Sequence, residues 1–197
     1  KPDLIHTIGC RSFQSFMAAL VSMIHRIPLI VSDYGGITTH PDIASGSIVK
    51  KIFYQLQIPM LRFVIGQASK IIAANEYEIQ DFVSFTKRKN ITILPTGIDF
   101  ESLQKCPFDF KSKHNITGRI ILFVGRFNRV KGIDLLLNAY SRICKEEKLS
   151  DVILVIMGSD FGFESTMKKM IEELHIKNRL KIIQNPKRDE VIAAYHA

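Results

Sequence analysis

The stretch that decides the fold class runs from Ile120 to Leu137 and reads IILFVGRFNRVKGIDLLL. Its first five residues are all apolar, which is typical of a strand covered on both faces of a parallel sheet. Gly125 follows directly, and Gly132 precedes a segment whose apolar residues recur at helical spacing. The stretch therefore predicts a strand, a short loop and a helix, the unit from which parallel α/β domains are built.

The same alternation extends over most of the chain. A helix with one apolar face is expected over 13–24, and Asn75 with Glu78 predicts the start of another helix. The residues from about Asp99 to Gly118 show no sustained period, which indicates a crossing between two domains. We therefore expect part of one domain in 1–100, an interdomain segment in 101–118 and the first part of a second domain in 119–197. Strands are expected in two groups, at 3–9, 27–31, 71–74 and 91–95, and at 119–124, 152–157 and 180–183.

Composition limits the class of protein further. The 197 residues carry 27 Lys and Arg against 19 Asp and Glu, a net charge of +8, and 46% are hydrophobic. That composition predicts a globular protein and excludes a disordered chain. The basic excess is spread over both halves, so we expect no nucleic-acid partner, although a phosphate-bearing ligand or an acidic membrane suits the charge. The cysteines, Cys10, Cys106 and Cys144, have no metal-binding spacing, so we expect no metal site and a reducing, cytoplasmic location.

Two apolar segments bear on membrane contact. The uncharged run from Ser12 to Ile24 has 13 residues, too few for a span of about 20. In the run from Ile48 to Gly66, apolar residues alternate with Lys50, Lys51 and Arg62, and Pro59 is expected to split or kink the helix. This run either rests on an acidic membrane surface or packs against its own sheet. Both interpretations stay open at this point.

The loop between Gly125 and Gly132 is the strongest candidate site. Ligands of open α/β sheets bind beyond the carboxyl ends of the strands, where helix N-termini present N–H groups and a partial positive charge. The loop adds Arg126, Arg129 and Lys131. Together these features predict an anion site, and the alternative is a solvated loop whose cations face water.

The motif Gly-Arg-x4-Lys-Gly-hydrophobic-Asp-x-Leu in this loop resembles one that group 1 glycosyltransferases (glycosyltransferase family 4) carry in their donor domain. Further segments resemble the family in the same order: Asp3–His6, Ser69–Glu76, Pro95–Asp99 and Val155–Asp160. The resemblance implies the GT-B fold, with two Rossmann-like parallel-sheet domains. Because both ends of the chain are abrupt and the family's Glu-x7-Glu motif is not among these residues, we expect each domain to be incomplete and the chain alone to be weakly active at most.

The resemblance also implies a function. A hexosyl group would pass from a nucleotide-diphosphate sugar to a glycan or lipid-linked acceptor, with retention and without a bound metal or cofactor. Arg126 and Lys131 would act as catalytic residues by neutralising the diphosphate, and peripheral contact with the membrane surface would suit a lipid-linked acceptor. The donor-binding residues implied are Gly125, Arg126, Lys131, Gly132, Gly158, Ser159, Gln184 and Lys187.

The acceptor side departs from the family pattern. Where many members place a histidine after the strand, this chain has Tyr34, and His40 follows six residues later. We expect Asp33, Tyr34 and His40 on the acceptor side and His40 among the catalytic residues; the alternative for His40 is a surface position. Two other functions stay open, a nucleotide-sugar epimerase of the same architecture and a non-catalytic phosphate- or nucleotide-binding module. A nicotinamide enzyme is not expected, because no Gly-x-Gly-x-x-Gly follows a strand.

Overall fold

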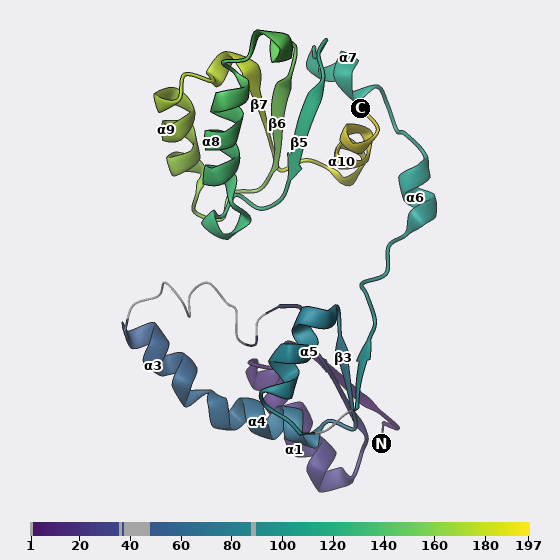
Figure 1. The fold of residues 1–197 in the computed structure, drawn as a ribbon. Helices are drawn as coiled ribbons and strands as arrows, with labels where there is room; N and C mark the ends of the chain where they lie inside the picture. Colours follow the sequence, from purple (N-terminus) through teal and green to yellow (C-terminus); the bar gives the residue numbers. More distant parts are fainter. Residues whose placement is uncertain (1, 36, 38–47, 88–89) are drawn as a thin grey trace. The chain divides into compact units, whose positions relative to one another are not determined.

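The computed structural model describes residues 2–35, 37, 48–87 and 90–197. The chain forms two compact units, unit 1 from Lys1 to Ile98 and unit 2 from Asp99 to Ala197, and each is described by itself (Figure 1). Unit 1 contains β1 (Ile5–Ile8), α1 (Phe13–His25), β2 (Leu29–Ser32), α3 (Ile48–Leu56), α4 (Ile58–Gln67), β3 (Lys70–Ala73), α5 (Glu76–Val83) and β4 (Ile91–Ile93). Unit 2 contains α6 (Phe100–Gln104), α7 (Phe110–His114), β5 (Ile120–Val124), η1 (Arg129–Lys131), α8 (Ile133–Ile143), η2 (Glu147–Leu149), β6 (Ile153–Gly158), α9 (Glu164–Glu173), η3 (Lys177–Arg179), β7 (Leu180–Gln184) and α10 (Arg188–Tyr195).

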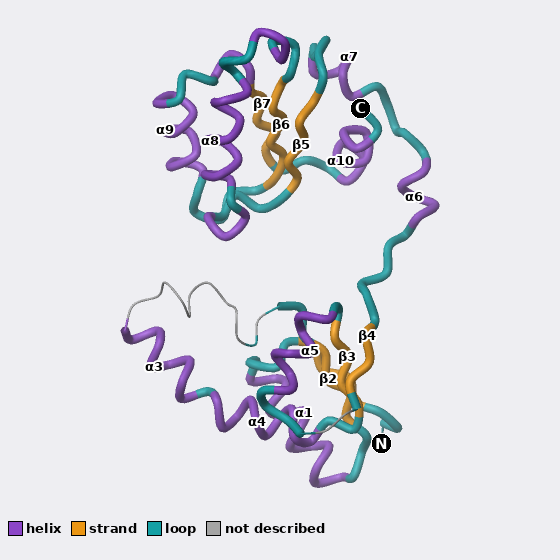
Figure 2. Tube along the Cα trace, viewed as in Figure 1, coloured by secondary structure: helices purple, strands orange, loops and turns teal. Residues whose placement is uncertain are grey.

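Both units contain a parallel sheet, in the orders β1-β2-β3-β4 and β5-β6-β7, so the expected α/β class is confirmed (Figure 2). In unit 2, α8 and α9 lie on one face of the sheet and α7 and α10 on the other (Figure 1). The apolar side chains of β6 are buried, as its unbroken apolar sequence predicts for a central strand covered on both faces. Each sheet therefore presents all its carboxyl ends at one edge.

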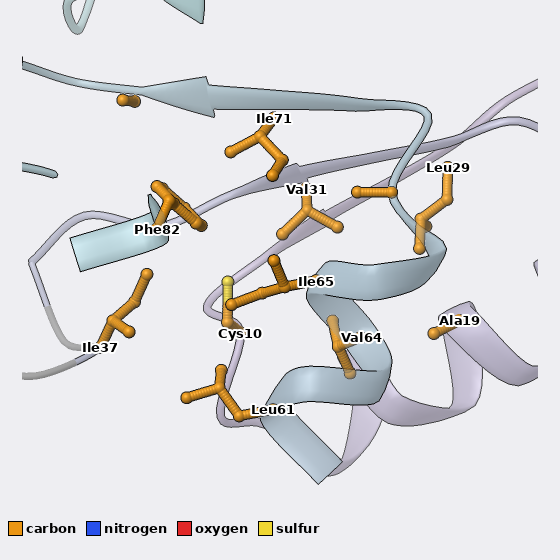
Figure 3. Close-up of a cluster of buried hydrophobic side chains, with 12 residues drawn as sticks. Cys10, Ala19, Leu29, Val31, Ile37, Leu61, Val64, Ile65, Ile71 and Phe82 are labelled. Atoms are coloured by element: carbon orange, nitrogen blue, oxygen red, sulfur yellow. The ribbon is translucent and has the colours of Figure 1, made fainter. Parts of the chain in front are cut away.

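The core of unit 1 is formed by aliphatic side chains of β2 and β3 against α4 and α1 (Figure 3). In α4 the buried residues are Leu61, Val64 and Ile65, one turn apart on one side of the helix. The sequence predicted an apolar face of α1, but Phe13 and Ile24 of that face are 69% and 62% exposed. The buried side of α1 is instead made of small residues, because α1 packs closely against α4 and β1; these residues are Ser15, Ala19 and Ser22.

The starts and breaks of the helices follow local chemistry. The Asn75 side chain accepts a hydrogen bond from the Glu78 N–H, and the Glu78 carboxylate accepts one from the Ala74 N–H at 2.7 Å, which confirms the predicted start of α5. The 48–66 run divides at Gln57, with Pro59 in the first turn of α4, as expected. Its two halves differ, because α4 is packed into the core whereas the apolar side chains of α3 are exposed.

The expected interdomain segment lies within unit 2 in the structure. It contains two short helices, and an aspartate caps each of them: Asp99 accepts from the Ser102 N–H and Asp109 from the Ser112 N–H. Phe110 is buried against β6 and α10, which fixes the segment to the unit. Hydrophobic periodicity missed both helices because they are five residues long.

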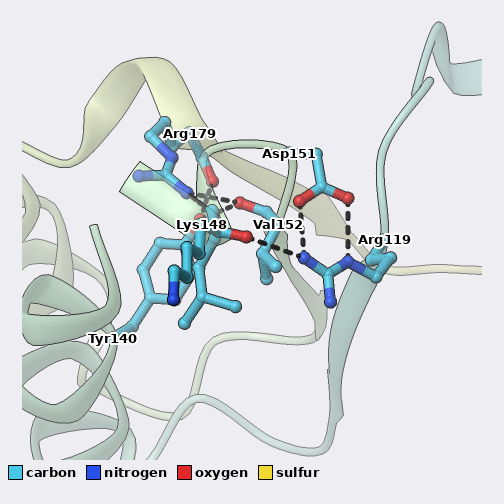
Figure 4. Close-up of polar contacts among 7 residues, drawn as sticks. Arg119, Tyr140, Lys148, Asp151, Val152 and Arg179 are labelled. Carbon is cyan, nitrogen blue, oxygen red and sulfur yellow. Dashed lines mark hydrogen bonds and ion pairs between the residues drawn. The ribbon is translucent and has the colours of Figure 1, made fainter. Parts of the chain in front are cut away.

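Tyr140 of α8 joins three elements of unit 2 (Figure 4). Its hydroxyl lies 2.9 Å from the Val152 carbonyl and 2.6 Å from the Arg179 carbonyl, and it accepts a hydrogen bond from the Leu154 N–H. The Arg179 guanidinium in turn donates to the carbonyls of Cys144 and Val152. This network anchors α8 to β6 and to the turn before β7.

We expect Tyr140→Phe to lower the free energy of unfolding by about 1–3 kcal/mol, because buried polar groups lose their partner. Burial raises the pKa of Tyr140 to about 12, so its neutral form stabilises the fold below pH ~10 and this contribution is lost as the pH rises from there. Urea unfolding at about pH 8 and about pH 11 measures both effects. An alkaline loss of stability that is as large in Tyr140→Phe as in the parent chain would exclude Tyr140 as its source.

Candidate functional site

The loops after β5 and β6 are joined by backbone hydrogen bonds at the carboxyl edge of the second sheet. The Gly125 N–H donates to the Met157 carbonyl at 2.9 Å, and the Phe127 N–H donates to the Ser159 carbonyl at 2.8 Å. The Phe161 N–H then donates to the Phe127 carbonyl at 3.0 Å. The Phe127 side chain is fully buried in the core of unit 2, so it also anchors the loop to that core. The backbone of the candidate anion loop is therefore held in place by the neighbouring loop and by the core.

Gly158 allows the two loops to approach each other. A Cβ at this position would lie 1.8 Å from the Gly125 carbonyl oxygen, so only glycine fits. The Asn185 N–H donates to the Gly158 carbonyl at 2.8 Å and adds the loop after β7 to the same edge. Among the described glycines of this edge, the closest backbone approach is thus at Gly158, whereas a Cβ at Gly125 would meet only the Phe123 ring, at 3.2 Å.

A short turn carries the chain from the loop into α8. The Asn128 side chain accepts from the Val130 N–H at 3.0 Å, and Gly132 has φ +68°, a left-handed conformation that favours glycine. Gly132 is also the residue before α8 and offers no side-chain acceptor to the first N–H groups of that helix. The start of α8 therefore presents backbone donors and the positive end of its dipole to this edge.

Three exposed cations surround this helix start. Within the described residues, Arg126, Arg129 and Lys131 form no ion pair. The Arg126 guanidinium carbon lies 5.0 Å from the centroid of the Phe161 ring, which orients the side chain by a cation–π contact. Asp134 is the one acidic residue in the first turn of α8, so the loop and helix start keep a net positive charge. This arrangement can bind and stabilise an anion with two or more negative charges.

The remaining predicted donor residues lie at the same edge. Gln184 ends β7 in register with Gly158, and Lys187 precedes α10. The pKa of Glu164 is lowered first by its hydrogen bond with Lys168 and then by one with Gln184, so the Gln184 amide contacts the start of α9. The structure therefore places all the residues expected to bind the donor at or after the carboxyl ends of one sheet: Gly125, Arg126, Lys131, Gly132, Gly158, Ser159, Gln184 and Lys187.

Asp160 and Phe161 are parts of this edge that the sequence did not single out. The Asp160 carboxylate accepts hydrogen bonds from the N–H groups of Gly162, Phe163 and Glu164, and these bonds, that of Glu164 first, hold its pKa below the usual range. Asp160 thereby closes the turn that carries Phe161 toward Arg126. The turn could have been predicted from an aspartate followed by a glycine and a helix-like run. No sequence signal predicts the contact between Phe161 and Arg126.

Of the residues expected on the acceptor side, Asp33 holds the loop after β1. Asp33 is buried at the carboxyl end of β2, and its carboxylate accepts from the Cys10 N–H at 2.9 Å. Burial, followed by the charge of Asp33, raises the pKa of the Cys10 thiol, which therefore stays protonated at neutral pH. Tyr34 is exposed, and His40 lies outside the described residues.

A pocket of about 350 Å³ opens at this edge of unit 1. Arg11 lies in its wall and donates to the Ile37 carbonyl at 2.6 Å and to the Gln57 side chain at 3.3 Å. Its guanidinium carbon lies 5.2 Å from the Tyr54 ring centroid, so Arg11 ties α3 to the loop after β1. Sequence reasoning missed Arg11, because one arginine after a strand predicts no particular contact. The pocket is lined by Gly9, Arg11, Ser12, Asp33, Phe53, Tyr54 and Gln57.

Comparison with known proteins gives the class. Residues 106–197 match the family described as glycosyl transferases group 1. The chain is 26% identical over 145 residues to D-inositol 3-phosphate glycosyltransferase of Mycolicibacterium smegmatis, covering 68% of this chain and 32% of that protein. It is also 26% identical over 122 residues to spore coat protein SA of Bacillus subtilis, covering 56% and 32%. The chain thus spans about a third of the length of these curated relatives.

Solved structures show the fold. Anabaena HepE in complex with UDP matches with a TM-score of 0.75 at 18% identity, over 96% of this chain and 50% of that one. Sucrose-phosphate synthase of Thermosynechococcus elongatus matches with a TM-score of 0.71 at 19% identity, over 98% and 48%. Both units of the chain therefore have the α/β architecture of GT-B proteins. The match to the group 1 glycosyltransferase family covers residues 106–197, which lie within unit 2.

Proposed function

We propose that the chain is part of a glycosyltransferase family 4 enzyme that transfers a hexosyl group from a nucleotide-diphosphate sugar to a glycan or lipid-linked acceptor. The observation that carries this proposal is the loop from Gly125 to Gly132, inside the family-matched segment. There, cations that pair with no described acidic residue meet the uncapped start of α8. The names of the relatives add support, since one is a glycosyltransferase and HepE was solved with UDP.

The loop suits the electronic demand of this reaction. When the bond between the sugar carbon and the terminal phosphate oxygen breaks, its electron pair stays on the diphosphate, whose negative charge grows. The cations of Arg126 and Lys131 and the N–H groups of α8 would stabilise that charge, with about 3 kcal/mol for each well-placed donor. The acceptor hydroxyl oxygen forms the new bond to the sugar, and its proton passes to the departing phosphate oxygen. In this proposal no metal or cofactor takes part, and the sugar keeps its anomeric configuration.

On the acceptor side we propose Asp33, Tyr34 and His40, with the pocket beside Arg11 as the place where the acceptor binds. Asp33 acts there through the backbone of the Cys10 loop, because its carboxylate holds that loop. We further propose a cytoplasmic enzyme in peripheral contact with the membrane. Among the described residues, no helix has the length and apolar character needed to cross a bilayer.

Titration calorimetry with UDP, GDP and inorganic phosphate tests the donor site. We expect one nucleoside diphosphate to bind at least about tenfold more tightly than phosphate, because a base and ribose add contacts at the carboxyl edge. Equal affinities would favour a phosphate-binding module. An epimerase would use the same cations, so product analysis with nucleotide-sugars separates it: a transferase releases the nucleoside diphosphate, whereas an epimerase returns an altered nucleotide-sugar.

A further inference from the structure

The α3 helix carries an apolar face that none of the described residues of unit 1 covers. Its members are Ile48, Val49, Ile52, Phe53 and Leu56, with exposed fractions between 55% and 77%. At 100° per residue these five positions span an arc of roughly 140° on the helix. Figure 2 shows α3 at the outside of the unit, where it leads into α4.

The opposite side of α3 holds the helix to the rest of the unit. Tyr54 lies roughly opposite the centre of the apolar arc, and its ring and carbonyl contact the Arg11 guanidinium. Gln57, just after the helix, accepts from the same guanidinium at 3.3 Å. The apolar face therefore points away from the contacts that fix α3, so it is available to a partner.

The basic residues near the apolar face of α3 indicate the charge of its partner. The sequence from Ile43 to Asn75 contains no acidic residue, whereas it contains Lys50, Lys51, Arg62 and Lys70. Lys51 and Arg62 are exposed. A helix with apolar residues on one side and lysines nearby matches the interfacial helices that lie on anionic bilayers. A second copy of the chain fits less well, because pairing two such helices would bring their lysines together.

We infer that α3 docks on an anionic lipid surface, with its apolar face among the acyl chains and Lys51 at the headgroups. This inference deepens the peripheral membrane contact of the proposed function and does not depend on sugar transfer. Phe53 belongs both to the apolar face and to the lining of the pocket beside Arg11. Docking by α3 would therefore place that pocket at the lipid surface, where a lipid-linked acceptor is found.

Sedimentation with vesicles tests the inference. We expect the chain to sediment with vesicles of equal parts phosphatidylcholine and phosphatidylglycerol, and much less with phosphatidylcholine alone or at high salt. The triple variant Ile48→Ser/Ile52→Ser/Leu56→Ser should retain at most about a tenth of the binding, because three exposed apolar side chains are lost. A matched control, Tyr77→Ser/Val83→Ser/Ile98→Ser, removes three exposed apolar side chains elsewhere in unit 1 and should bind like the parent chain.

A second variant, Lys50→Glu/Lys51→Glu, keeps the apolar face and should lose the preference for anionic vesicles even if the triple variant does not fold. Unchanged binding by either set of α3 variants, or no binding by the parent chain, would overturn the inference. If light scattering shows that the parent chain is a dimer, that the triple variant is a monomer and that the parent does not bind vesicles, the apolar face belongs to a contact with a second copy instead. The α3 variants should bind nucleoside diphosphate like the parent chain, so failure of docking and failure of the donor site are seen in separate experiments.

Discussion

Replacing Arg126 and Lys131 together by alanine is expected to weaken nucleoside diphosphate binding by at least about a hundredfold, since each charge-assisted contact contributes about 1.5–3 kcal/mol. Both side chains are exposed and form no ion pair among the described residues, so their removal leaves the fold intact. The loss should appear in calorimetric titration with UDP and GDP, and the melting temperature should stay within a few degrees of the parent value.

The matched control for this prediction is Arg142→Ala/Lys145→Ala. It removes the same number of exposed cations from unit 2, but at the carboxyl end of α8 rather than at its start. We expect it to reduce affinity by less than about threefold, through the change in net charge alone. If the control loses as much affinity as the loop variant, the cations act through the general charge of the protein, and the assignment of the donor loop is wrong.

Gly158→Ala is expected to destabilise unit 2 by about 3 kcal/mol or more. The added Cβ would lie 1.8 Å from the Gly125 carbonyl oxygen, and the backbone of both glycines is held by hydrogen bonds between β5, β6 and β7. Because no flexible side chain can move aside, the loops themselves must separate. Urea unfolding followed by circular dichroism measures the change.

The control for the glycine prediction is Gly97→Ala, a position with open space for a Cβ and no positive φ. It should change the free energy of unfolding by less than about 0.5 kcal/mol. If Gly158→Ala is as mild as this control, the two loops are not closely apposed. The separation of the loops in a destabilised Gly158→Ala chain should also weaken nucleoside diphosphate binding, since Arg126 and Phe161 then lose their relative position.

Much of the fold was predictable because strands and helices are encoded locally. The apolar run of β6 and the asparagine cap of α5 both lie where their sequence patterns place them. The buried side of α1 was not predictable, since small residues are the fully buried ones there, whereas Phe16 is only half-buried against α4 and Phe13 and Ile24 are exposed. Which face of a helix is buried depends on its neighbours in space, and a periodic pattern alone does not identify them.

In the candidate site, too, local patterns were predictable from the sequence, whereas contacts between distant segments were not. The loop with Arg126, Arg129 and Lys131 was a candidate because it follows a strand and precedes a helix, where ligands bind in open sheets, and the family resemblance singled out Arg126 and Lys131. Phe161 and Arg11 were not identified, because each makes its contact with a residue far away in the sequence. Phe161 contacts Arg126, 35 residues earlier, and Arg11 contacts Tyr54, 43 residues later. His40 stays a prediction, as it lies outside the described residues.

The central claim is that the loop from Gly125 to Gly132 binds the diphosphate of a nucleotide. Amide chemical shifts of the isotope-labelled chain, recorded during titration with UDP or GDP, test it most directly. We expect the largest changes at the backbone N–H groups from Gly125 to Leu135, with smaller ones near Ser159 and Gln184. Changes confined to unit 1, or shifts identical to those caused by inorganic phosphate alone, would contradict the account.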